Sequence, residues 1–119
     1  MNKTQAYNNF WNSFGLIAYD EGSVPDDAKL PYITFSVGMD DFDHPIALTA
    51  SLWYRSGRWE AITLKAEEIA NKISRGGITV PYDKGVIWIK KGQPFAQRVK
   101  DEDDSIRRIY LNIEVEFID

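Results

Sequence analysis

The end of the chain carries an alternation of apolar and polar side chains that limits what the fold can be. From residue 109 to 117 every odd position is apolar, whereas the even positions from 108 to 116 hold Arg108, Tyr110, Asn112, Glu114 and Glu116. Side chains of a β-strand project to opposite faces with a period of two, so the pattern predicts a strand with one buried face. Burying five such apolar side chains contributes on the order of 10 kcal/mol before chain entropy is subtracted. We therefore expect a core strand here, around which the rest of the chain packs.

The start of this strand departs from the pattern. Ile106 and Arg107 have the wrong parity for the alternation that follows them. A β-bulge near Arg107 and Arg108, or a strand that begins only at Arg108, would explain the departure. We expect the strand to bend here, away from the sheet and toward a neighbouring molecule.

Two segments have the spacing of amphipathic helices. Residues 4–14 place aromatic side chains at helical intervals and are followed by Gly15, a residue type that often ends helices. Residues 59–74 carry Trp59 and a row of alanines and isoleucines on one side, with charged residues on the other. Gly76 and Gly77 are expected to end this second helix. We interpret the apolar stripe of each helix as core packing.

The remaining segments indicate further strands. Alternation predicts strands at residues 32–37 and 46–54, and a short edge strand is possible at residues 16–19. Residues 78–82 and 86–90 are expected to form a hairpin around a tight turn at residues 83–85. A turn is expected at residues 91–94, and residues 95–99 are ambiguous. The order of elements predicts an α+β fold, in which two helices pack on one face of a mainly antiparallel sheet.

Several classes of protein are excluded or disfavoured by composition. The chain of 119 residues has no cysteine, which excludes disulfides, thiolate metal sites and cysteine nucleophiles. Its formal net charge of −4 does not suit a protein that wraps nucleic acid. No apolar run approaches the roughly 20 residues needed to cross a bilayer, so we expect no membrane partner.

One cluster could carry chemistry. Asp40, Asp41, Asp43 and His44 bring three carboxylates and the single histidine of the chain together, as a divalent cation site or an acid/base pair would require. No second histidine exists to complete a zinc site, and aspartates before Pro45 also suit a solvated turn. A small metal-binding enzyme domain built on these residues is therefore the less favoured alternative.

Other residues fit a protein interface better than a core or an active site. Trp53 falls on the less apolar face of its strand, and arginines and lysines gather in the C-terminal hairpin. Aromatic and arginine side chains outside a core are common anchors of protein interfaces. The expected contact residues are Trp53, Trp88, Lys90, Arg107, Arg108, Tyr110, Asn112 and Glu114.

Three stretches, which together cover most of the chain, resemble the tail terminator (tail completion) proteins of long-tailed bacteriophages and prophages. They are GLIAYDEGSVPDDAKLPYITFSV at residues 15–37, SLWYRSGRWEAITLKAEEIANKI at residues 51–73 and GQPFAQRVKDEDDSIRRIYLNIEVEFI at residues 92–118. The resemblance lies in the order of these structural segments, since none of them is a catalytic motif. It implies that residues 1–119 form a single tail-terminator-like domain.

The resemblance also implies a function. A protein of this family forms a ring, typically a hexamer, on the head-proximal end of the tail tube, where it stops tube polymerisation and offers the docking surface for the head connector. It would be assembled in the bacterial host cytoplasm and end in the virion, with the tail tube protein and the connector as partners. No cofactor and no reaction are implied, and DNA would pass through the ring without specific binding. A head-completion or neck protein of the head–tail joint is the alternative.

A closed ring needs two different complementary patches on every subunit. We expect the final strand and the hairpin at residues 86–90 to supply one patch. The loops at residues 20–30 and 38–45 are the expected contacts to the tube, the connector or the lumen.

Overall fold

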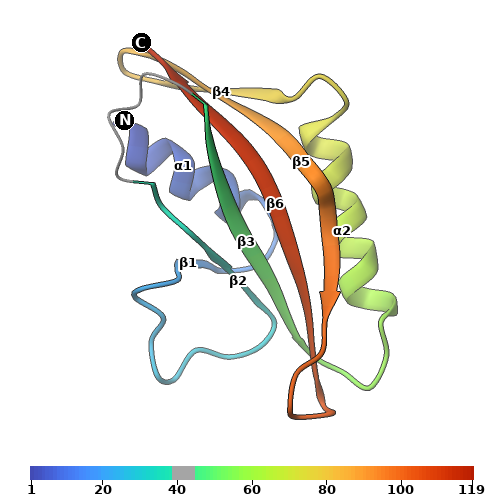
Figure 1. The fold of residues 1–119 in the computed structure, drawn as a ribbon. Coiled ribbons are helices and arrows are strands. Elements are labelled where there is room, and N and C mark those ends of the chain that lie inside the picture. Colours follow the sequence, from blue (N-terminus) through green and yellow to red (C-terminus); the bar gives the residue numbers. More distant parts are fainter. Residues whose placement is uncertain (39–44) are drawn as a thin grey trace.

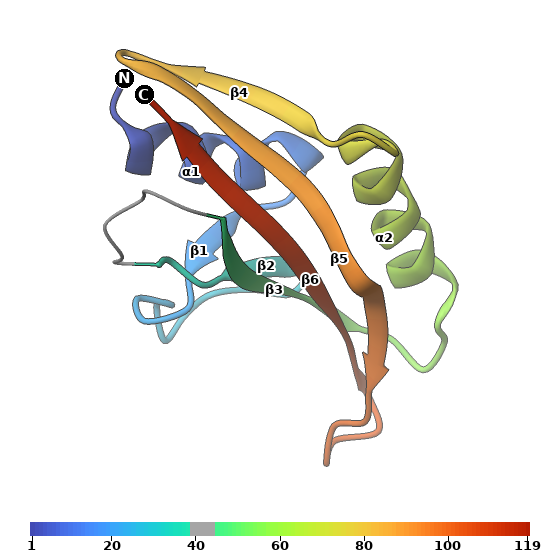
Figure 2. The same cartoon turned by 45° about the horizontal axis from the view of Figure 1, so that its top comes forward.

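A computed structural model describes residues 1–38 and 45–119 of the chain. Six strands form one curved sheet in the order β1-β2-β3-β6-β5-β4 (Figure 1, Figure 2). Every neighbouring pair is antiparallel except β1 and β2, which run parallel. The elements are α1 (Lys3–Trp11), the 3-10 turn η1 (Asn12–Phe14), β1 (Ala18–Asp20), β2 (Tyr32–Phe35), β3 (Ile46–Arg55), α2 (Glu60–Ile73), β4 (Ile78–Tyr82), β5 (Gly85–Val99) and β6 (Ile106–Ile118).

The segment predicted as one helix, residues 4–14, forms helix α1 and the η1 turn that follows it. Asn2 caps α1 by accepting a hydrogen bond from the backbone N–H of Gln5, whose side chain accepts one from the backbone N–H of Asn2 in return. The chain leaves the following η1 turn at Gly15, whose φ of 80° is left-handed. Between these ends the helix buries its aromatic stripe, and Trp11 stacks on Phe35 of β2 with ring centroids 6.5 Å apart. The stripe is core packing.

Both helices cover the same face of the sheet, as the alternation predicts. Ile109, Leu111, Ile113 and Val115 of β6 are all buried on this face, and they join one core with the apolar side chains of α1 and α2. The predicted α+β architecture is therefore confirmed. In the described part of the chain, no helix is long and apolar enough to span a membrane.

The predicted bulge in the last strand is wrong. β6 runs unbroken from Ile106 to Ile118, and its register with β3 is continuous from Ile46 opposite Val115 to Arg55 opposite Ile106. The parity change arises because Arg107 takes the place of an apolar residue on the helix side of an otherwise regular strand.

The irregularity lies instead in the neighbouring strand. Where β6 advances from Ile113 to Leu111, β5 advances from Lys91 to Ala96, so β5 accommodates extra residues at this point. The turn expected at residues 91–94 is consequently wrong, and residues 95–99 are strand. Asn112 of β6 stabilises the irregular stretch, because its side-chain Nδ2 donates to the carbonyl oxygen of Pro94 at 2.9 Å.

Candidate interface on the open face of the sheet

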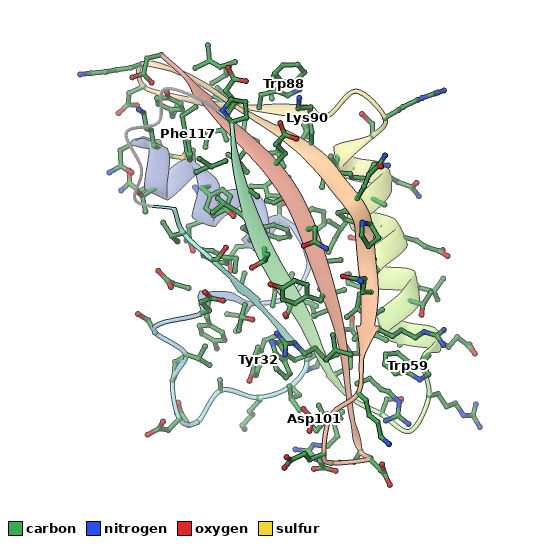
Figure 3. The ribbon with its side chains drawn as sticks, viewed as in Figure 1. Tyr32, Trp59, Trp88, Lys90, Asp101 and Phe117 are labelled. Atoms are coloured by element: carbon green, nitrogen blue, oxygen red, sulfur yellow. The ribbon has the colours of Figure 1, made fainter. Side chains whose placement is uncertain are left out.

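The face of the sheet that points away from both helices is not covered by any described element. We call it the open face. Seven of the eight residues expected at an interface lie on it, since pairing places Trp53 beside Arg108, Lys90 beside Glu114 and Trp88 beside Glu116. Figure 3 shows Tyr32, Trp88 and Lys90 on this side of the ribbon. The residues of the open face include Tyr32, Trp53, Trp88, Lys90, Arg108, Tyr110, Asn112 and Glu114.

Arg108 is the centre of one half of the open face. Its guanidinium carbon lies 4.5 Å from the ring centroid of Trp53 and 5.4 Å from that of Tyr110. Its Nε donates to the hydroxyl of Ser51 at 3.1 Å, and Ser51 is only 3% exposed. Cation–π contacts on both sides and a buried hydrogen bond hold the guanidinium in one orientation. The guanidinium is therefore held in place on the open face, where it remains partly exposed.

An aromatic row extends this half of the face toward the sheet edge. Trp53 donates from its indole Nε1 to the hydroxyl of Thr34 at 2.9 Å, which fixes the ring. The rings of Tyr32 and Trp53 lie 6.5 Å apart, and Tyr19 of β1 meets Tyr32 edge-on at 5.6 Å. These three rings are half-buried. Rigid aromatic side chains with partly exposed rings lose little entropy on binding, which is why they recur as interface anchors.

The other half of the open face is more polar and more exposed. Lys90 Nζ lies 4.4 Å above the ring of Trp88 and 3.8 Å from a carboxylate oxygen of Glu114. Trp88 donates from Nε1 to the carbonyl oxygen of Gly76 at 3.1 Å. An ion pair this exposed contributes little to stability, about 0–1 kcal/mol. Its charges are available to a partner instead.

The structure places Arg107 away from the open face. It lies opposite Tyr54 on the helix side of the sheet, where its Nη2 donates to the carbonyl oxygen of Gly57 at 2.9 Å and its Nη1 to that of Asp104 at 2.7 Å. Its guanidinium also lies 5.3 Å from the ring of Trp59. Arg107 thus joins the loop before α2 to the loop before β6, and this bracing role explains why a polar side chain stands at an apolar position.

Sequence reasoning did not anticipate the partner of Arg107. Trp59 was expected on the apolar stripe of α2, but it is only half-buried and lies between two arginines, with Arg98 at 4.7 Å and Arg107 at 5.3 Å from its ring. The sequence signal available was an arginine on the helix side of each of two neighbouring strands, Arg98 in β5 and Arg107 in β6, where an apolar residue would be expected. Their meeting at one indole depends on how β5, β6 and α2 pack.

The carboxylate cluster considered for metal binding lies outside the described residues. Asp40, Asp41, Asp43 and His44 all fall there. Within residues 1–38 and 45–119, no group of three or more histidine, aspartate or glutamate side chains is arranged to hold a metal ion. The geometry of the open face suits adhesion, since it combines rigid rings, paired charges and hydrogen-bonding amides.

Comparison with known proteins adds one finding about the fold. No family model and no curated protein sequence matches the chain. The class that the architecture defines is a curved, mainly antiparallel sheet with two helices on one face. A chain of this class occurs in a solved structure described as the virion of a native gene transfer agent (GTA) particle. It matches with a TM-score of 0.61 and 15% sequence identity, over 96% of this chain and 84% of that chain.

Proposed function

We propose that this protein is a structural virion component that caps the phage tail tube, ends tube polymerisation and forms the docking surface for the head connector. In this proposal residues 1–119 act as one tail-terminator-like domain and assemble into a ring, with a hexamer expected. The ring sits at the head-proximal end of the tail, and the protein works by adhesion rather than by catalysis.

The observation that carries the proposal is the fold likeness to a virion chain along nearly the whole length of this one. Two features of the molecule support it. The open face offers pre-organised aromatic and arginine anchors of the kind that interfaces use. The net charge of −4 suits a ring through which DNA slides without sticking.

We assign the open face to contacts with the tail tube and the head connector. Both edges of β6 are already paired, to β3 and to β5, so this strand can contact a neighbour only through its exposed side chains. Arg108, Tyr110 and Glu114 are therefore contacts by side chain, not by strand addition. Their mixed charge allows complementary pairing with a partner surface.

The test is a tube-length assay. Purified protein is mixed with tail tube subunits during polymerisation, and tube length is measured by negative-stain imaging with and without it. A terminator gives short tubes with a ring at one end. Tubes of unchanged length would overturn the terminator assignment, and rings that bind connector but not tube would favour the head-completion or neck alternative. Light scattering on the protein alone checks for the ring.

A further inference from the structure

The edges of the sheet are protected against strand addition at most points. On the outer edge of β1, the side-chain amide of Asn12 engages both backbone groups of Ala18. In the β4–β5 hairpin, hydrogen-bonded and non-hydrogen-bonded residue pairs alternate, beginning with the hydrogen-bonded pair Tyr82 and Gly85. Pro81 is therefore in a non-hydrogen-bonded pair, so its backbone nitrogen faces the outer edge of β4, and proline has no N–H there to offer another strand.

A longer stretch of edge, on β5, has no protection of this kind. β4 pairs with β5 only as far as Ile89, and the irregular segment that follows contains Pro94, so the free backbone edge is Ala96–Val99. A groove of about 240 Å³ runs between this edge and α2. Its walls include Ala66, Ala70 and Ala96, whose small side chains leave room for another backbone. An extended segment could add here as a further strand.

The end of the groove is positively charged. Beside it lies a hollow of about 380 Å³ that shares Arg98 with the groove and is also lined by Trp59, Lys100 and Arg107. Neither guanidinium is within 4 Å of a carboxylate in the described part of the chain, although Asp101 and Asp104 also line the hollow. One carboxylate oxygen of Asp101 accepts a hydrogen bond from the backbone N–H of Asp103 instead. The guanidinium of Arg98, over the ring of Trp59 and near Lys100, can donate hydrogen bonds to an external carboxylate, whereas the Nη atoms of Arg107 already donate to the carbonyl oxygens of Gly57 and Asp104.

The opposite side of the molecule carries a segment with acidic side chains, which are opposite in sign to the basic residues of the hollow. The loop at residues 21–31 joins β1 to β2, at the far end of the sheet from β5 (Figure 1, Figure 2). Glu21, Asp26 and Asp27 are exposed in it, and Lys29 is its single base. A loop on one edge and a charged groove on the other give each subunit the two different patches that a closed ring requires.

We infer that the groove between α2 and Ala96–Val99 receives the acidic loop 21–31 of a second copy of this chain. The loop backbone adds to the free edge, and the carboxylates of Asp26 and Asp27 pair with Arg98 and Lys100. This inference rests on the proposed ring and names the contact between its subunits, while the open face stays available to the tube or the connector.

The absence of cysteine allows a direct test by cross-linking. Ser23→Cys and Asp104→Cys change two exposed side chains, one in the loop and one at the hollow, and leave Asp26, Asp27, Arg98, Lys100 and Arg107 intact. A short bis-maleimide is expected to convert the double variant into a ladder that ends at the ring number. The matched control combines Ser23→Cys with Lys72→Cys, which is exposed in the last turn of α2, and is expected to stay monomeric on a denaturing gel.

The outcomes separate this inference from the proposed function. Rings in light scattering without a ladder, or with equal ladders in both double variants, would overturn the inference and leave the function standing. No ring and no tube capping would overturn both. As a second measurement, Asp26→Lys with Asp27→Lys, and separately Arg98→Glu with Lys100→Glu, should each raise the concentration for half-assembly roughly tenfold. Combining all four changes should restore assembly, and failure to restore it would count against the pairing.

Discussion

The side-chain amide of Asn12 completes the edge of the sheet at Ala18. Its Oδ1 accepts a hydrogen bond from the backbone N–H of Ala18 at 2.9 Å, and its Nδ2 lies 3.3 Å from the carbonyl oxygen of the same residue. One side chain from the turn after α1 thus takes the place that a neighbouring strand would occupy. Unpaired edge strands tend to pair with strands of other chains. The hydrogen bonds from Asn12 to Ala18 therefore reduce edge-to-edge aggregation at this edge.

Replacing Asn12 tests that role. Asn12→Ala leaves both backbone groups of Ala18 without their partner, and we expect the free energy of unfolding to fall by about 1–2 kcal/mol. Light scattering should also show faster aggregation on mild heating. Asn9→Ala, at an exposed position of α1, is the control and should change neither quantity. Equal behaviour of the two variants would contradict the edge-protecting role.

Two adjacent arginines should respond differently to truncation. Arg107→Ala removes the hydrogen bonds that join the carbonyls of Gly57 and Asp104, and should cost about 1–3 kcal/mol of stability in urea unfolding. Arg108→Ala removes a partly exposed side chain from the open face, and should cost about 1 kcal/mol or less. We nevertheless expect Arg108→Ala to lose tube capping. Leu64→Ser, at a 60% exposed position on α2, should leave capping intact.

Gly77 lies where a side chain cannot be placed without strain. Its φ is 90°, and a Cβ would sit 2.6 Å from Nε1 of Trp88 and 2.7 Å from the carbonyl oxygen of Ile89. Gly77→Ala should therefore destabilise the protein by about 1–3 kcal/mol and shift the fluorescence of Trp88. At Gly57 nothing lies within 4 Å of the new atom, so Gly57→Ala should stay within about 0.5 kcal/mol of the parent. Similar losses in both variants would contradict this explanation.

Stability should decline at alkaline pH because of Tyr7. Burial of the ring raises the pKa of Tyr7 above its usual value of 10.0, and the hydroxyl donates to the carbonyl oxygen of Ser36 at 3.1 Å. The unfolded chain loses this proton near pH 10, whereas the folded protein retains it to higher pH. The stability that the raised pKa of Tyr7 gives to the folded state is therefore fully present below pH 10 and is lost as the pH rises further.

Tyr7→Phe is the variant that checks this. It should lower stability at pH 7 by about 1 kcal/mol, through the lost hydrogen bond, and make the decline above pH 10 less steep. Urea unfolding between pH 8 and 11 measures both effects. Tyr19→Phe, on the opposite face, is the matched control and should retain the steeper decline. A parallel profile for Tyr7→Phe and the parent would show that another group controls the alkaline transition.

Local pattern was sufficient for the type of most elements. Alternation in β6, helical spacing in α1 and α2, and the Asp83–Lys84 hairpin turn depend on neighbours in sequence, so residue types alone determined them. The same alternation assigned Arg108, Tyr110, Asn112 and Glu114 to one face before any partner strand was known.

The tertiary structure decided everything that depends on which strands meet. Arg107 looks like a break in β6, but a continuous ladder with β3 keeps the strand unbroken and turns the side chain toward Gly57 and Trp59. Pro94 looks like part of a turn, but pairing with β6 carries β5 past it. Backbone hydrogen bonds to a buried central strand outweigh local turn preference, because leaving them unmade inside the sheet costs more than an irregular stretch. The free edge at Ala96–Val99, and with it the groove beside α2, exists only because β4 is shorter than the strand it pairs with.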